Sequence, residues 1–215
     1  MSRKEHWEEI YSSKSDNELS WTQADPRLSL TLINEVAHGQ GTVVDVGGGN
    51  SVLADRLLDA GYAVTVLDIS ESALAGARQR LGARASQVRW IAADVTTVRD
   101  LGTFDVWHDR AVFHFLTDPG DRRKYIALAE RSIPLGGHLV IGTFALDGPE
   151  KCSGLSVERY DGKKLDTEFV AGFARTKDLT ETHMTPWGKP QQFHYAVFER
   201  VPIQQTRQGE SAQIR

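Results

Sequence analysis

A run of three glycines lies between two apolar segments, an arrangement typical of a ligand-binding turn. The run, Gly47–Gly49, follows the apolar residues 42–46 and precedes a segment with helical periodicity. Glycine has no Cβ, so its backbone can approach a bound molecule closely. A second apolar segment ends at Asp68, where a carboxylate is well placed to accept both hydrogen bonds of a ribose diol. Residues 43–70 therefore have the pattern of a β-α-β unit that binds a nucleotide.

Carboxylates end four successive segments that we predict to be strands. They are Asp45, Asp68, Asp94 and Asp109. Ligands of open parallel sheets bind outside the carboxyl ends of the strands, so we expect the four side chains at one binding edge. The alternative interpretation is that each carboxylate caps the helix that follows it. For Asp94 both interpretations stay open.

The spacing of the glycines separates two kinds of cofactor. The dinucleotide fingerprint requires Gly-x-Gly-x-x-Gly, and Val52 occupies the place of its third glycine. The residues from Asp45 to Ser51 instead follow Asp-x-Gly-x-Gly-x-Ser. This pattern resembles motif I of the class I S-adenosylmethionine-dependent methyltransferases. Asp68 stands where that family places its ribose-binding acid.

The resemblance implies a binding site for S-adenosylmethionine. The glycine loop would lie against the methionine and ribose part of the cofactor, with Asp45 at the methionine end and Asp68 on the ribose. Asp94 would bond the adenine amino group, while Ile69 and Val95 would line the ring. The implied cofactor-binding residues are Trp21, Asp45, Gly47, Gly48, Gly49, Asp68, Ile69, Asp94, Val95 and Asp109.

The segment after the fourth predicted strand bears on the methyl acceptor. Many nucleic-acid amino methyltransferases carry Asn-Pro-Pro-Tyr here, and residues 104–116 lack it, which argues against DNA adenine chemistry. The segment is closer to the Phe-Asp pattern, followed by a histidine, of small-molecule and some protein methyltransferases. Asp109 is expected at the methionine end of the cofactor. His114 is the candidate general base, because histidine has an intrinsic pKa near neutrality; the alternative is a hydrogen-bonded core histidine.

The first 40 residues have helical patterns and carry several aromatic side chains. Trp7, Tyr11 and Trp21 resemble the lead-in of a group of bacterial methyltransferases and of related protein-lysine methyltransferases. The resemblance implies that residues 1–40 form a helical lid, with Trp21 against the cofactor and Tyr11 reaching the substrate. The alternative is that both aromatic side chains only hold the helices to the sheet.

Four residues are candidates for contact with the acceptor: Tyr11, Arg110, Cys152 and His183. Cys152 is either a reactive thiol or an inert one, and His183 fits a structural hairpin role equally well. The histidines and the single cysteine lack the spacing of a metal site, so we predict no metal. Methyl transfer requires no covalent bond to the protein, since the cofactor is already activated.

Strands and helices alternate through the centre of the chain and would position these residues. We expect strands at 42–46, 63–67, 88–92, 104–107 and 138–144, with helices at 51–60, 70–81 and 119–132. A loop-like segment at 146–156 precedes a helix at 160–169 and two strands at 174–183 and 191–199. This order predicts an α/β, Rossmann-like class I methyltransferase fold: a mostly parallel seven-stranded sheet with an antiparallel last strand and helices on both faces.

Length and composition indicate a single domain of ordinary type. We expect one domain over residues 1–203 of the 215, followed by a disordered polar tail at 204–215. A net charge of −4 argues against general nucleic-acid binding. The single cysteine fits a reducing compartment. Apolar runs long enough for a membrane span or a signal peptide are absent, which favours a cytoplasmic protein without membrane partners.

The leading functional hypothesis is an S-adenosylmethionine-dependent methyltransferase that acts on an oxygen, nitrogen or sulfur atom of a small molecule. The first alternative is a protein-lysine methyltransferase, which the aromatic lead-in favours. The second alternative, of another class, is a module that binds S-adenosylmethionine without catalysis.

Overall fold

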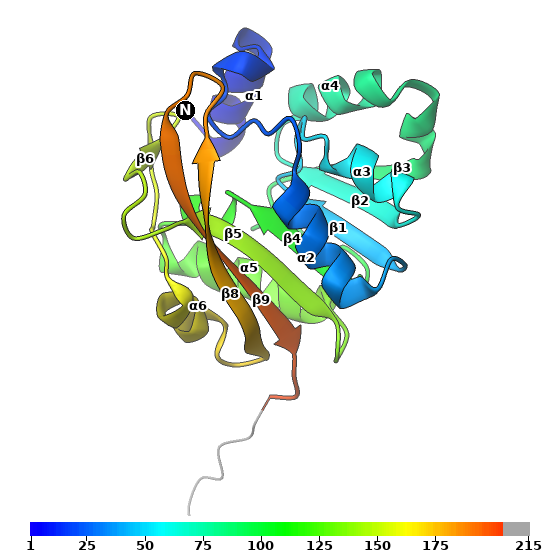
Figure 1. Cartoon of the computed structure of the whole chain (residues 1–215), viewed down its shortest axis with the longest axis vertical. Helices are drawn as coiled ribbons and strands as arrows, with labels where there is room; N and C mark the ends of the chain where they lie inside the picture. Colours follow the sequence, from blue (N-terminus) through cyan, green and yellow to red (C-terminus); the bar gives the residue numbers. More distant parts are fainter. Residues whose placement is uncertain (204–215) are drawn as a thin grey trace, which may run out of the picture.

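The sheet in the computed structural model has seven strands, in the order β3-β2-β1-β4-β5-β9-β8 (Figure 1). Their bounds are β1 Thr42–Val46, β2 Ala63–Asp68, β3 Val88–Ala92, β4 Val106–Arg110, β5 His138–Phe144, β8 Phe173–Met184 and β9 Pro190–Arg200. Strands β1 to β5 are parallel, and β9 is antiparallel to both of its neighbours. The predicted fold class is confirmed. The structure describes residues 1–203, so the predicted disordered tail at 204–215 lies outside the described part.

The chain order of the sheet reverses at β1, which has β2 on one side and β4 on the other. The register pairs Asp45 with His108 and Val46 with Asp109, so the ends of β1 and β4 are level. Open α/β sheets bind their ligands in the crevice at such a reversal point. The topology therefore places the binding site at the edge formed by the ends of β1, β2 and β4.

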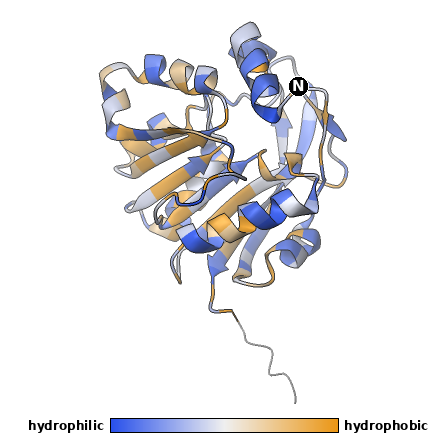
Figure 2. Cartoon of the chain, turned by 180° about the vertical axis from the view of Figure 1, so that it is seen from behind, coloured by the Kyte–Doolittle hydropathy of each residue, from blue (hydrophilic) through white to orange (hydrophobic). Residues whose placement is uncertain are grey.

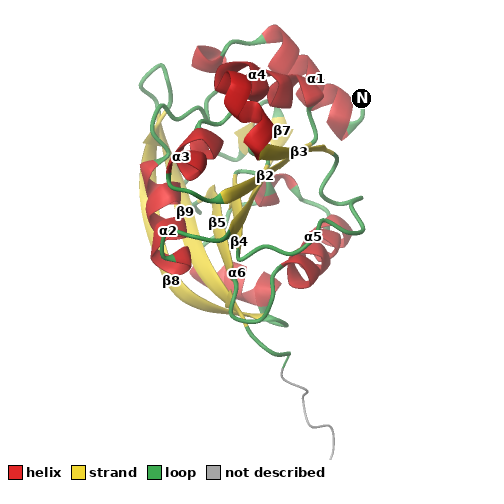
Figure 3. Cartoon of the chain, turned by 90° about the vertical axis from the view of Figure 1, so that its right-hand side faces the viewer, coloured by secondary structure: helices red, strands yellow, loops and turns green. Residues whose placement is uncertain are grey.

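Helices cover both faces of the sheet (Figure 3). Their bounds are α1 Arg3–Ser13, α2 Arg27–Ala37, α3 Leu53–Asp59, α4 Glu71–Leu81, α5 Pro119–Ser132 and α6 Gly162–Phe169, with short 3-10 helices η1 Asp16–Glu18, η2 Gly82–Gln87 and η3 Phe113–Phe115. Polar caps set several of the starts. The hydroxyl of Ser70 accepts a hydrogen bond from Ala73 N at 3.1 Å, as the sequence predicts for α4. Asp118 caps α5, whose first residue is proline.

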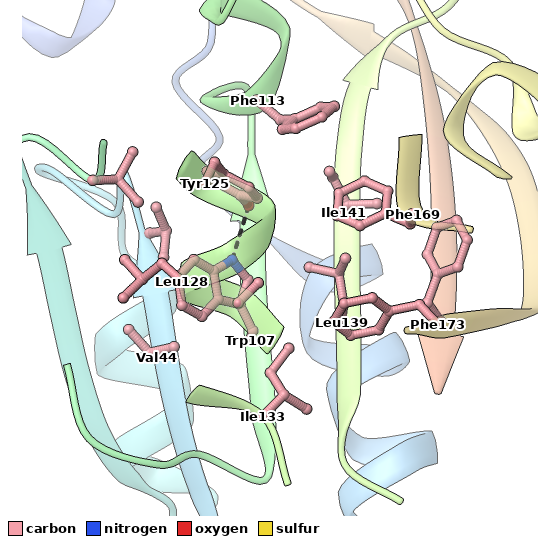
Figure 4. Close-up of a cluster of buried hydrophobic side chains, with 14 of the residues drawn as sticks. Val44, Trp107, Phe113, Tyr125, Leu128, Ile133, Leu139, Ile141, Phe169 and Phe173 are labelled. Carbon is pink, nitrogen blue, oxygen red and sulfur yellow. Dashed lines mark hydrogen bonds between the residues drawn. The ribbon is translucent and has the colours of Figure 1, made fainter. Parts of the chain in front are cut away.

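Alternate strand residues supply two hydrophobic cores, one on each face of the sheet. Val43 packs with α2, α3 and α4, whereas Val44 packs with α5 and α6. Apolar residues accordingly fill the strands while polar residues cover the outer helices (Figure 2). In the core under α5, Trp107 donates a hydrogen bond to the hydroxyl of Tyr125 at 2.8 Å (Figure 4). This bond satisfies the indole N–H of a fully buried side chain.

Three segments differ from the sequence-based expectation. The fourth strand, expected at 104–107, runs over Val106–Arg110, so His108 and Asp109 lie within it. The predicted loop at 146–156 contains a small hairpin, β6 Lys151–Cys152 and β7 Leu155–Ser156. Ser153 and Gly154 form its turn, and both have positive φ, as a tight two-residue turn requires.

The segment expected to form a lid, residues 1–40, divides into two parts. Only α1 and the segment after it lie over the binding edge, because α2 packs against the sheet and buries Leu32 and Ile33.

Among the described residues, no helix combines the length and the apolar character that a membrane crossing requires.

Candidate active site

The glycine loop turns sharply at the end of β1 and has no room for side chains. Gly47 has φ +70°, and a Cβ at this position would overlap Val112. A Cβ on Gly48 would lie 2.6 Å from Oδ2 of Asp45, so the carboxylate packs directly under the loop. Glycine is required here both by the backbone angle and by the close packing.

Asp45 is held beneath this loop by a buried chain of hydrogen bonds. Its Oδ1 lies 2.7 Å from Nδ1 of His108, and Nε2 of His108 lies 2.9 Å from the hydroxyl of Ser29. All three side chains are almost inaccessible to solvent. The chain joins β1, β4 and α2, and it fixes the carboxylate at the reversal point of the sheet.

Asp68 ends β2 and is also buried. Its Oδ1 accepts a hydrogen bond from Ser70 N at 2.8 Å. Burial raises the pKa of Asp68 to about 7, and the nearby negative charges of Asp45 and Glu8 act in the same direction. Among the described residues no cationic side chain pairs with Asp68, so its carboxylate is available to accept hydrogen bonds from a bound polar group.

Two adjacent cavities meet at this edge of the sheet. The smaller, about 90 Å³, is lined by Asp68, Ile69, Asp94 and Val95 among others. The larger, about 290 Å³, is lined by Asp45, Gly47, Gly48 and the segment from Asp16 to Pro26. Tyr11, Trp21, Gly47 and Arg110 line both. The structure thus gathers most of the residues that the sequence assigns to a cofactor, in a space close to that of known ligand pockets.

Aromatic side chains from α1 and from the segment after it roof the smaller cavity. The ring of Trp7 lies 5.7 Å from Trp21 and 5.0 Å from Phe115, measured between centroids, in edge-to-face arrangements. Tyr11 lies 6.1 Å from Trp21. Burial and the charge of Asp68 raise the pKa of Tyr11, so its hydroxyl stays protonated. The expectation that Tyr11 and Trp21 reach the binding site matches their positions, and Trp7 joins them.

Arg3 ties α1 to the far end of the smaller cavity. Its Nη1 donates to Oδ2 of Asp94 at 2.9 Å, and its Nη2 donates to Oδ2 of Asp121 at 2.6 Å. Asp94 also accepts hydrogen bonds from the backbone and hydroxyl of Thr96. Asp94 therefore caps a turn and also lines the smaller cavity, so its position fits both the capping role and the adenine-binding role.

Glu8 ties the same helix to the start of α4. Its carboxylate accepts hydrogen bonds from Glu71 N at 2.6 Å and from Ser72 N and the Ser70 hydroxyl, each at 3.2 Å. These donors lie at a helix N-terminus, where a negative charge is stabilised. The sequence analysis missed Arg3 and Glu8, because no local pattern distinguishes their charges from those of an ordinary exposed helix face.

Asp109 does not face the cavities, contrary to the expectation for this residue. Its carboxylate is fully buried and accepts hydrogen bonds from Val112 N, Phe113 N and the hydroxyl of Tyr125, at 2.9, 3.1 and 2.6 Å. Burial raises its pKa to about 6. The three donors belong to the turn after β4 and to α5. Asp109 therefore holds the turn that carries the cavity wall.

His114 also lies outside both cavities, and the core-histidine alternative describes its position. The side chain is fully buried between Phe115 and Phe144, and its Nδ1 accepts a hydrogen bond from Phe144 N at 3.1 Å. Burial, followed by the positive charge of Arg110, lowers its pKa to about 3. The 3-10 turn at 113–115 directs the ring into the core, and His114 lines neither cavity.

Three candidate acceptor residues have different surroundings. Cys152 lines the smaller cavity, and burial raises the pKa of its thiol. His183 lies outside both cavities, with Nε2 at 2.7 Å from the backbone oxygen of Ser20, in line with the structural alternative. Arg110 lines both cavities. Within residues 1–203, no group of three or more histidine, cysteine or acidic side chains is arranged to hold a metal ion.

The geometry fits an adenosine cofactor with a charged methionine end. The glycine cradle excludes every Cβ, Asp68 offers acceptor oxygens at the end of β2, and apolar side chains of Ile69 and Val95 line the smaller cavity. A dinucleotide would require the third glycine of its own motif, and Val52 replaces it.

Comparisons with known proteins agree with this reading. Residues 43–137 match a family model described as a methyltransferase domain. No curated protein matches the chain. Among solved structures, one from work on the conversion of a disulfide bond into a thioacetal group during echinomycin biosynthesis is 21% identical, covers 92% of this chain and 93% of that one, and has a TM-score of 0.74.

Two further structures contain S-adenosylhomocysteine. The N-methyltransferase NodS from Bradyrhizobium japonicum is 16% identical, with 93% and 99% of the two chains covered and a TM-score of 0.71. The 1,6-didemethyltoxoflavin-N1-methyltransferase from Burkholderia thailandensis is 18% identical, with 89% and 80% covered and a TM-score of 0.66. Fold, glycine loop and family model together define a methyltransferase. Residues 43–137 match the model of a methyltransferase domain, and the solved structures that contain S-adenosylhomocysteine share the fold of the chain; both findings support S-adenosylmethionine as the cofactor.

Proposed function

We propose that this methyltransferase acts on an oxygen, nitrogen or sulfur atom of a small molecule. The observation that carries the proposal is the chamber that the two cavities form beneath α1. Trp7, Tyr11, Trp21 and Phe115 form its aromatic wall. Because the adenosine part of the cofactor would occupy the smaller cavity, the space that is left beside it suits a small acceptor. A polypeptide substrate would require α1 to leave the site, which the bonds of Arg3 and Glu8 oppose.

The proposal assigns the cofactor contacts to residues at the strand ends. Asp68 would bind the ribose diol. Asp45 and the glycine loop would bind the methionine end, and Asp94 with its apolar neighbours would bind the adenine. When bound, S-adenosylmethionine supplies a methyl group that is already activated. The protein therefore has to orient the acceptor and exclude water, and the aromatic roof serves both purposes.

No histidine of the described chain is placed to act as a general base in the chamber. His114 and His183 lie outside the cavities, and both ring nitrogens of His108 are engaged by Asp45 and Ser29. We propose that catalysis relies on positioning rather than on a protein base. The acceptor then reacts in a form that already carries a free electron pair.

One of the similar structures supports an acceptor of low molecular weight, because it contains bound 1,6-didemethyltoxoflavin beside S-adenosylhomocysteine. Its likeness to this chain concerns the fold, so experiment has to identify the acceptor.

A methyl-transfer screen tests the proposal. The purified protein is incubated with S-adenosylmethionine labelled in its methyl group, together with either a low-molecular-weight metabolite extract or a dialysed protein lysate. The expected result is label in small molecules. Label in protein lysine would instead support the protein-lysine alternative, and binding of S-adenosylhomocysteine without transfer to either pool would support a non-catalytic module.

We also propose a cytoplasmic location. The protein has a single cysteine, which fits a reducing compartment. Cell fractionation followed by immunoblotting tests this; recovery with the envelope or secreted fraction would contradict it.

A further inference from the structure

Arg110 carries a positive charge that the fold leaves without a counter-ion. Its Nε donates to the hydroxyl of Tyr195, and its Nη1 donates to the backbone oxygen of Trp21, both at 2.9 Å. Its Nη2 is covered from solvent and has no hydrogen-bond partner. The side chain of Arg110 lines both cavities.

No carboxylate within residues 1–203 lies within 4.0 Å of the guanidinium of Arg110. Glu181, opposite Phe193 in the β8–β9 pair, is close enough for its charge to act on Tyr195 as that of Arg110 does. Its oxygens nevertheless lie beyond the 4.0 Å of an ion pair with Arg110, and its Oε2 is buried without a hydrogen-bond partner. The charge of Arg110 also acts on its surroundings. Burial is the largest cause that lowers the pKa of His114 and of His183, and the positive charge of Arg110 is the second largest for both. Arg110 is half-buried, but its Nη2 is shielded from water without a hydrogen-bond partner, and such an atom is unfavourable unless a ligand supplies an acceptor.

The guanidinium contacts residues of β9. Its carbon lies 4.3 Å from the ring centroid of Phe193, and its Nε donates to the hydroxyl of Tyr195. In the sheet order β9 is separated from β4 by β5, on the side opposite β1. Arg110 therefore contacts the opposite side of the sheet from β2, whose end carries Asp68, and it shares the smaller cavity with Cys152.

We propose that Arg110 binds an anionic group of the methyl acceptor, and that the acceptor is a small organic acid. The inference rests on the small-molecule acceptor proposed above. A guanidinium recognises carboxylates and other anionic oxygens through charge-assisted hydrogen bonds. It repels an ammonium group, so the same residue acts against lysine as an acceptor. S-adenosylmethionine brings a second positive charge, its sulfonium, into the chamber, which strengthens the preference for an anion.

A binding experiment examines Arg110 without catalysis. The protein saturated with S-adenosylhomocysteine is titrated with benzoate and with the neutral analogue benzamide, and its thermal midpoint is recorded. Benzoate should raise the midpoint of the wild type, raise it less in Arg110→Lys and leave it unchanged in Arg110→Met. Benzamide should not distinguish the three proteins. Arg99→Met, which removes an exposed arginine outside both cavities, is the matched control and should behave as the wild type.

Two results of that experiment would overturn the inference. One is a benzoate response that is absent from the wild type or equal in Arg110→Met. The other is a loss of S-adenosylhomocysteine affinity of tenfold or more in both Arg110 variants, which would assign the residue to the carboxylate of the cofactor. The inference predicts cofactor affinity within about twofold of the wild type for Arg110→Lys.

The labelling screen separates this inference from the function on which it rests. The metabolite extract is divided by anion exchange before the reaction. Label should appear in products of the retained, anionic fraction. Once the acceptor is purified, the Arg110→Lys variant should show a KM for it that is about 10- to 100-fold higher than that of the wild type, with a smaller change in kcat. Label from the neutral or cationic fraction alone would refute the acidic acceptor while the small-molecule function stands. Label in protein alone would refute both.

Discussion

Replacement of Asp68 by asparagine tests the assignment of this residue to the ribose and its dependence on pH. A hydrogen bond to a charged acceptor contributes about 1.5–3 kcal/mol. Asparagine keeps one oxygen, which can still accept from Ser70 N, but it loses the charge and the second acceptor. We therefore expect S-adenosylhomocysteine to bind about 10- to 150-fold more weakly, which corresponds to about 1.5–3 kcal/mol.

The pH dependence gives a second, independent signature. Burial raises the pKa of Asp68 to about 7 in the ligand-free protein, and the ionised carboxylate is the form that accepts two hydrogen bonds. Wild-type affinity should therefore increase about tenfold from about pH 6 to about pH 8, with release of a proton on binding. The stability of the ligand-free protein depends on pH in the opposite direction from the cofactor affinity. The folded state holds a proton longer than the unfolded chain, so the stabilising contribution of Asp68 is present below pH ~4 and is lost as the pH rises through about 7.

Calorimetric titration with S-adenosylhomocysteine at several pH values measures both signatures. Buffers with different ionisation enthalpies reveal the released proton. Asp100→Asn is the matched control, because Asp100 accepts a hydrogen bond from the N–H two residues later, as Asp68 does, but is exposed. Equal affinity and an equal pH profile in Asp68→Asn and wild type would refute the reasoning, and Asp68 would then only shape the turn before α4.

Three further substitutions separate structural from binding roles. Asp109→Asn should lower the free energy of unfolding by about 2–4 kcal/mol, measured by urea denaturation, because it weakens a fully bonded buried carboxylate; a loss of cofactor affinity without a loss of stability would contradict this. Arg3→Gln should accelerate association of S-adenosylhomocysteine in stopped-flow tryptophan fluorescence, because it frees Asp94 and loosens α1; slower association would argue against the lid. His114→Ala should lower the unfolding midpoint but leave kcat within about threefold for the folded enzyme, since the ring is fully buried and lines neither cavity; a large fall in kcat at unchanged stability would restore it as a base.

Local signals were sufficient to predict the framework of the site. The glycine spacing, the acid at the end of β2 and the polar cap of α4 act within a few residues of one another, and each follows from backbone geometry. These features predicted the sheet, the cofactor and most of the cavity lining. The role of β4 was harder to predict, since the residues after it form a tight turn rather than an ordinary helix. That turn directs Asp109 and His114 into the core.

Long-range contacts explain what the sequence did not reveal. Arg3 forms ion pairs with Asp94 and Asp121, which lie 91 and 118 residues away in the sequence. Such pairing depends on where α1 lies in the folded protein. The unpaired nitrogen of Arg110 is similarly a property of its surroundings, because Tyr195 and Trp21 satisfy the rest of the guanidinium from β9 and from the segment after α1. Residue type and spacing alone indicate neither the pairing of Arg3 nor the unpaired nitrogen of Arg110.

The central claim is that the strand ends and the glycine loop form an S-adenosylmethionine site. Calorimetric titration of the purified protein with S-adenosylhomocysteine, and separately with NAD, tests this claim most directly. We predict one site per chain with a Kd of about micromolar or tighter for S-adenosylhomocysteine and no measurable heat with NAD. Tight binding of NAD without binding of S-adenosylhomocysteine would contradict the account.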